Sequence, residues 1–220
     1  MEAEALVPKM EDVLNGKKIV VIGDSLIYGG SIGKEITWVN KLTKYGMIPY
    51  NYGICGNSIA KNDQDHNPPM CERYVKMEDG ADYVVVLGGA NDRNYNIPLG
   101  ENDSEDTRTF KGALNVLIRG IIKKYPRARI LFMTNYDRWR APNAIGLCDI
   151  DYVTAMEEVC HKHSIPCFNN YYNSGINFNN PDQNAWIDEG PYRGKGSNYH
   201  FSPEGYDWLL PKYAAILRML

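Results

Sequence analysis

The feature that most restricts the fold of this chain is an alternation of short apolar segments with helical patterns. Three short predicted strands, residues 19–22, 47–52 and 83–87, are each followed by glycine, as buried parallel strands often are. Two further strands are predicted over residues 129–134 and 165–168. Because strands that alternate with helices form parallel sheets covered on both faces, the pattern predicts an α/β fold.

Helical apolar spacing fills the intervals between these segments. The predicted helices span residues 35–45, 107–125, 151–163 and 203–219. Gly46 ends the first of them and Pro126 ends the second. Residues 169–199 show little regular pattern, and a loop of that length in a compact domain is typically functional or disordered.

Length and composition indicate one globular domain. The chain has 220 residues, 44% of them apolar and 23% charged, and a single core can grow to about 250 residues. We expect an N-terminal extension over residues 1–17 and a single catalytic domain over residues 18–220. A net charge of −3 with only short basic clusters argues against a nucleic-acid partner.

Cysteine usage and the N-terminus bear on the compartment. The five cysteines are an odd number without framework spacing, which favours a reducing compartment. No signal-peptide core precedes residue 18, and no segment approaches the roughly 20 apolar residues that span a bilayer. We therefore expect a soluble cytoplasmic protein, or a secreted one if an upstream segment was removed. The oligomeric state stays open.

Polar motifs follow three of the predicted strands, where ligands of parallel sheets bind. They are Gly23-Asp24-Ser25, Gly53-Ile54-Cys55-Gly56-Asn57 and Gly88-Gly89-Ala90-Asn91-Asp92. A serine at a strand-to-helix turn exposes its hydroxyl, while Gly56 and Asn91 offer N–H donors to an oxyanion. Each motif alone is also compatible with an ordinary turn, in which Asp24 or Ser25 caps a helix and Asp92 binds turn amides.

A nucleophilic serine needs a base, because its hydroxyl is inert at neutral pH. The chain offers His66, His161, His163 and His200. His200 immediately precedes the last predicted helix, whereas His161 and His163 lie at a helix end, where a cation suits the dipole. Together with Cys160 and Cys167 these two histidines match no usual zinc spacing, so no metal is expected.

Taken together, these motifs resemble those of the SGNH hydrolases, also called GDSL-type esterases. The residues that match the four blocks of that family, in order, are Ser25, Gly56, Asn91 and His200. The resemblance implies a flavodoxin-like, three-layer α/β/α sandwich with a five-stranded parallel sheet in the order 2-1-3-4-5. It also implies that no metal or organic cofactor takes part.

The same resemblance implies the role of each residue. Ser25 is the nucleophile, and His200 is the general base and then the general acid. The oxyanion hole consists of the backbone N–H groups of Ser25 and Gly56 and the side chain of Asn91. We expect the Ser25 hydroxyl to lie within hydrogen-bond reach of the His200 ring.

One position departs from the family pattern. The family places an aspartate three residues before the histidine, and this chain has Ser197 there. In enzymes where that acid orients the imidazole, its loss lowers kcat about 10⁴-fold. A backbone carbonyl or water is our first choice of substitute and Asp188 the second. Glu189 and the neutral acceptors Ser197 and Asn198 are further alternatives.

The segments expected around the site are polar and aromatic, which suits sugar rings better than long acyl chains. They are residues 94–96, 136–140, 171–173 and Trp186. The predicted substrate contacts are Asp24, Asn57, Asp92, Tyr95, Arg138 and Trp139. Arg138 or Arg140 could instead bind a carboxylate or phosphate.

The favoured function is hydrolysis of small acyl esters, especially acetyl esters, of a small-molecule or carbohydrate substrate. A lysophospholipase or thioesterase would use the same catalytic groups. The missing acid at position 197 leaves a third alternative, a non-catalytic binding domain of this fold.

Overall fold

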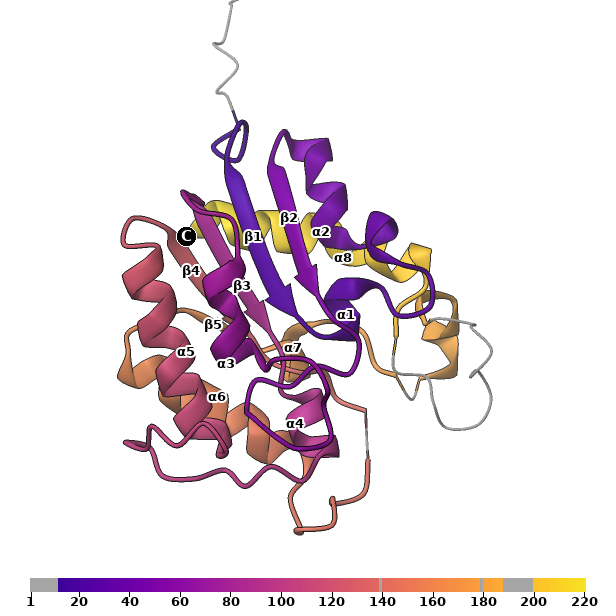
Figure 1. Ribbon diagram of the computed structural model, residues 1–220. Helices are drawn as coiled ribbons and strands as arrows, with labels where there is room; N and C mark the ends of the chain where they lie inside the picture. Colours follow the sequence, from indigo (N-terminus) through magenta and orange to yellow (C-terminus); the bar gives the residue numbers. More distant parts are fainter. Residues whose placement is uncertain (1–11, 139, 179, 188–199) are drawn as a thin grey trace, which may run out of the picture.

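The computed structural model describes residues 12–138, 140–178, 180–187 and 200–220. Five strands form one all-parallel sheet in the order β2-β1-β3-β4-β5, which confirms the predicted flavodoxin-like topology (Figure 1). The strands are β1 (Lys18–Gly23), β2 (Ile48–Gly53), β3 (Tyr83–Leu87), β4 (Arg129–Met133) and β5 (Cys167–Phe168).

Helices cover both faces of this sheet (Figure 1). The α-helices are α1 (Ser25–Tyr28), α2 (Trp38–Lys41), α3 (Met70–Arg73), α4 (Ala90–Asn94), α5 (Phe110–Lys124), α6 (Asp149–Lys162), α7 (Asn170–Asn173) and α8 (Pro203–Met219). The 3₁₀ helices are η1 (Lys34–Ile36), η2 (Leu42–Tyr45), η3 (Tyr74–Lys76) and η4 (Pro181–Trp186). Helices α2 and α8 pack on one face of the sheet, and α3, α5 and α6 pack on the other.

The apolar segment of β1 is continuous because both of its faces are buried. Ile19 and Val21 join the cluster that contains α2 and α8. Val20 and Ile22 join the cluster on the opposite face, with α3, α5 and α6. A central parallel strand therefore lacks the polar alternation of a strand with one solvated face.

Some predicted boundaries are wrong. The helix predicted over 35–45 is split into η1, α2 and η2, because Thr37 takes an extended backbone (φ −73°, ψ 157°) between the first two. The last strand is two residues long, since it begins only after Pro166. The short helices α3 and α4 were not predicted, because four or five residues are too few for a periodic pattern.

The ends of the chain add two observations. Of the expected extension over 1–17, residues 1–11 lie outside the described residues, and Leu14 is fully buried against the core. In the part of the chain that the structure describes, no helix has the length and apolar character needed to cross a membrane.

Candidate active site

Three strands end side by side at the edge where the site is formed. Gly23 of β1 is in register with Gly53 of β2 and with Leu87 of β3, so the turns that follow leave the sheet together. The backbone N–H of Ile54 donates to the Gly23 carbonyl (3.1 Å), which holds the second turn against the first. The three sequence motifs therefore meet at the carboxyl edge of the sheet.

Ser25 is the first residue of α1 and directly follows the turn after β1. Asp24 caps this helix, since its Oδ1 accepts from the backbone N–H of Leu26 (2.9 Å). The Ser25 hydroxyl lies 2.8 Å from Nε2 of His200, although 175 positions separate the two residues. The predicted hydrogen-bond contact between Ser25 and His200 is therefore present, and Ser25 is only half-buried.

The residues that follow His200 hold it in place. Phe201 forms an antiparallel bridge with Ile187. Ser202 caps α8: its hydroxyl accepts from the backbone N–H of Gly205 (3.1 Å) and donates to the Ala185 carbonyl (2.6 Å). The start of the longest helix thus fixes the backbone two residues from the imidazole.

Gly30 forms a wall beside the imidazole. It has a φ of +56°, and a Cβ at this position would lie 2.9 Å from Cγ of His200. A side chain here would both strain the backbone and push the ring away from Ser25. The role of Gly30 was not predicted, because its contact with His200 joins distant parts of the sequence.

The predicted oxyanion donors lie on adjoining turns. Nδ2 of Asn91 donates to the Asn57 carbonyl (3.0 Å), and because a carboxamide carries two N–H donors, the second can bind an oxyanion. Gly56 has a φ of +75°, and its carbonyl accepts from the Tyr95 hydroxyl (2.9 Å). Within the described residues, the backbone N–H groups of Ser25 and Gly56 donate to no other protein group.

Asp92 holds a loop through its two carboxyl oxygens. It is fully buried, and its two carboxyl oxygens accept from the backbone N–H groups of Ile59 (3.0 Å) and Ala60 (2.8 Å). Burial raises the pKa of Asp92 to about 7. This carboxyl therefore fixes the loop that continues from Gly56 and Asn57, and the substrate contact predicted for Asp92 stays a prediction.

Asn57 belongs to a buried polar cluster around Arg73. The Arg73 guanidinium donates to Oδ1 of Asn57 (2.6 Å) and to the carbonyls of Tyr52 (2.7 Å) and Gly23 (2.8 Å). Asn57 is 1% exposed and also donates to Asp65 (2.8 Å), and its predicted substrate contact stays a prediction. Arg73 was missed, because nothing local distinguishes it from a surface arginine.

Asp24 and Arg138 are also buried, at 1% and 7% exposure, and the substrate contacts predicted for both stay predictions. Burial raises the pKa of Asp24, and the positive charges of Arg138 and Arg73 partly oppose this shift. The Arg138 guanidinium also lies over the ring of Phe178, 5.5 Å from its centroid.

Other predicted residues remain untested. The substrate contact predicted for Tyr95, a half-buried residue beside Gly56, stays a prediction. Trp139, a predicted substrate contact, lies outside the described residues, as do the four candidate partners of the imidazole: Asp188, Glu189, Ser197 and Asn198.

The histidine–cysteine cluster considered from the sequence forms no common site. Nε2 of His163 hydrogen-bonds Oδ1 of Asn115 (2.8 Å), and Cys160 is buried in the apolar core. Among the described residues, no three histidine, cysteine or acidic side chains gather closely enough to hold a metal ion.

Comparison with known proteins places this site in a family. The model of the GDSL-like lipase/acylhydrolase family matches residues 21–208, a range that includes Ser25, Gly56, Asn91 and His200. The chain belongs to this family. Membership in the GDSL-like family makes the protein a carboxylic ester hydrolase, which confirms the predicted enzyme class.

Solved structures share the fold of this chain. One crystal structure superposes with a TM-score of 0.84 at 33% identity, covering 94% of this chain and 98% of the other. A protein from Lactobacillus plantarum superposes with a TM-score of 0.79 at 23% identity, covering 92% of this chain and 97% of the other. A carbohydrate acetylesterase family member from Sinorhizobium meliloti superposes with a TM-score of 0.63 at 14% identity, covering 92% of this chain and 98% of the other. At this identity the likeness shows the fold alone. A search of curated protein sequences found no significant match.

Proposed function

We propose that this protein hydrolyses small acyl esters, especially acetyl esters of carbohydrates, through an acyl-enzyme intermediate on Ser25. The observation that carries this proposal is the 2.8 Å hydrogen bond between the Ser25 hydroxyl and Nε2 of His200. A nucleophile within hydrogen-bond reach of its base is the arrangement that serine catalysis requires.

The mechanism follows from the positions of these groups. His200 takes the proton of the Ser25 hydroxyl as its oxygen attacks the ester carbonyl. The negative charge on the carbonyl oxygen is stabilised by the backbone N–H groups of Ser25 and Gly56 and by the Asn91 amide. His200 then protonates the leaving alcohol, and a water molecule, activated by the same imidazole, releases the acid and restores Ser25.

The surroundings of the oxyanion donors favour a small acyl group. The Tyr95 hydroxyl is bound to the Gly56 carbonyl, and Nδ2 of Asn94 lies 3.4 Å from Oδ1 of Asn91. Polar side chains thus border two of the donors, where a long acyl chain would need an apolar surface. This supports acetyl over long-chain esters.

Hydrolysis of p-nitrophenyl acetate and p-nitrophenyl butyrate tests the proposal. We expect wild-type activity on acetate at least equal to that on butyrate, and a loss of about 10³-fold or more in kcat for Ser25→Ala. Equal rates for the wild type and Ser25→Ala would remove Ser25 as the nucleophile. A clear preference for long acyl chains would instead favour a lysophospholipase or thioesterase.

A further inference from the structure

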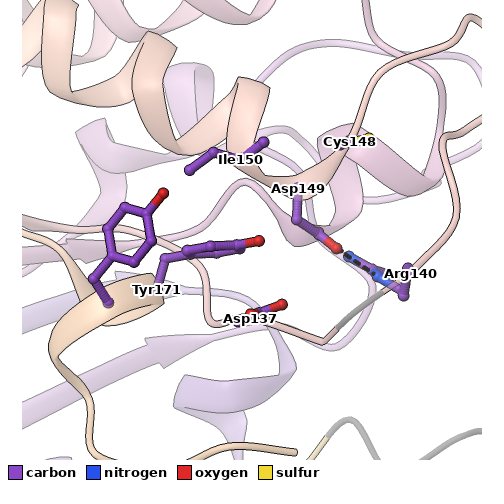
Figure 2. Close-up of a pocket in the computed structure, with 7 residues that line it drawn as sticks. Asp137, Arg140, Cys148, Asp149, Ile150 and Tyr171 are labelled. Carbon is purple, nitrogen blue, oxygen red and sulfur yellow. Dashed lines mark hydrogen bonds and ion pairs between the residues drawn. The ribbon is translucent and has the colours of Figure 1, made fainter. Parts of the chain in front are cut away.

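A pocket of about 520 Å³ opens beside the carboxyl ends of β4 and β5. Figure 2 shows Tyr171 on one side of this pocket and the ion pair between Arg140 and Asp149 on the other, with Asp137 and Ile150 between them. None of these five residues takes part in the hydrogen bond between Ser25 and His200 or belongs to the three predicted oxyanion donors.

A second hollow of about 320 Å³ adjoins the first. The two share Asp137, Tyr171 and Tyr172, and the second continues along residues 174–177. Together they form a groove, which we call the tyrosine groove. Two adjoining hollows suit a chain of linked units better than a single small molecule.

The tyrosine groove is joined to the oxyanion side of the active site by hydrogen bonds. Nη1 of Arg140 donates to Oδ1 of Asn94 (2.6 Å), and Nδ2 of Asn94 lies 3.4 Å from Oδ1 of Asn91. Nε of Arg140 donates to Oδ2 of Asp149 (3.0 Å), and Asp149 also accepts from Asn135 (3.0 Å). One residue, Asn94, therefore separates the wall of the groove from a predicted oxyanion donor.

The side chains of the groove fit a neutral sugar. Tyr172 is 69% exposed, and its ring meets that of Tyr171 edge-on at 5.0 Å between centroids, so apolar ring surface is open to a ligand. The Arg140–Asp149 pair is nearly buried, with side chains 10% and 4% exposed, which makes it a rigid polar surface for hydroxyl groups.

The same lining disfavours the alternative ligands. Asp137 and Asp149 place two negative charges against the single positive charge of Arg140, so a phosphate or carboxylate would be repelled. The larger pocket has one aliphatic side chain, Ile150, which is too little apolar surface for a fatty acyl chain.

On the basis of the esterase function proposed above, we propose that the tyrosine groove is a carbohydrate subsite. It binds the sugar chain that carries the scissile ester, with sugar rings against Tyr171 and Tyr172 and hydroxyl groups on Asp137 and the Arg140–Asp149 pair. Ester cleavage itself stays with Ser25 and His200, at the far end of the Asn91–Asn94–Arg140 connection.

The test compares wild type, Tyr172→Ala and Tyr172→Phe on p-nitrophenyl acetate and on O-acetylated xylotriose. Tyr172 is exposed and is not one of the catalytic residues. We therefore expect its replacement to leave the fold and the hydrolysis of p-nitrophenyl acetate unchanged. We expect Tyr172→Ala to lower kcat/KM on the acetylated trisaccharide about tenfold, mostly through KM, because the ring contact is lost. Tyr172→Phe keeps the ring and retains most of this activity.

Calorimetric titration with unacetylated xylotriose gives a readout that needs no catalysis. The wild type and Tyr172→Phe bind it, and Tyr172→Ala binds about tenfold more weakly. Equal kinetics and equal binding for wild type and Tyr172→Ala would overturn the subsite while leaving the esterase proposal intact. A wild type that cleaves neither ester overturns the esterase proposal, and the titration alone then decides whether the groove binds sugar.

Discussion

At the scale of single residues, burial divides the predicted site into two groups. Ser25 and His200 are half-buried and touch each other, as the reaction requires. Asp24, Asn57 and Asp92 have the same polar chemistry but are buried and hydrogen-bonded within the protein. Sequence could single out all five as candidate site residues, but it could not distinguish catalytic groups from those that hold the turns.

Gly30→Ala tests the wall beside His200. The added methyl group would lie 2.9 Å from Cγ of the ring, so the imidazole must move away from Ser25. We expect kcat for p-nitrophenyl acetate to fall about 100-fold, since displacements near 1 Å cost that much. Gly80→Ala is the control: Gly80 has a similar φ of +69°, but a Cβ there would meet no atom within 4 Å. This variant should lose stability but not kcat.

The raised pKa of Asp92 predicts that the stability of the protein depends on pH. Its pKa is raised from 3.8 to about 7 by burial, so between about pH 4 and pH 7 the folded chain holds a proton that the unfolded chain has lost. The contribution of this carboxyl to stability is therefore greatest near pH 4 and falls as pH rises through 7, by on the order of a few kcal/mol.

Urea unfolding of the wild type and Asp92→Asn across this pH range measures the effect. The asparagine does not titrate, and its amide nitrogen cannot accept from Ile59 or Ala60. The free-energy advantage of the wild type over the variant should shrink from pH 4 to pH 7. An advantage that grows with pH would mean that the two backbone N–H groups hold the ionised carboxylate instead.

At the scale of elements, the site depends on how helices begin. Ser25 opens α1 behind its cap Asp24, and His200 lies two residues before Ser202, the cap of α8. The proline at the first position of α8 made the start of this helix predictable. The contact of Ser202 with Ala185 was not predictable, because it joins α8 to a segment with no periodic pattern.

Ser202→Ala tests whether this cap positions the imidazole. We expect a loss of about 1 kcal/mol in stability, typical of an N-cap, together with a fall of about tenfold in kcat as His200 loses its fixed backbone. Thr109→Ala is a matched control. Thr109 caps α5 with the same pair of bonds, accepting from the Gly112 N–H and donating to the Asp106 carbonyl. Equal effects of both variants on kcat would contradict the positioning role.

At the scale of the whole molecule, the sheet order explains how distant motifs meet. Strands β2 and β3 flank β1, so the turns after all three strands lie at the same edge of the sheet. This edge is at the topological switch point, where ligands of parallel sheets bind. The sequence predicted this much, because buried strands and glycine turns leave local patterns. It also placed residues 136–140 and 171–173, which include residues that line the tyrosine groove, around the site. It did not predict the Arg73 cluster, which depends on contacts between residues far apart in the chain.

The role of Ser25 as the nucleophile can be tested by labelling the whole protein with a fluorophosphonate and mapping the adduct by mass spectrometry. Such a reagent reacts with an activated serine and stays bound, so it identifies the nucleophile without knowledge of the substrate. We predict one adduct, on Ser25, that forms much more slowly in His200→Gln. An adduct on another residue, or none on Ser25 in the wild type, would show that Ser25 is not the nucleophile.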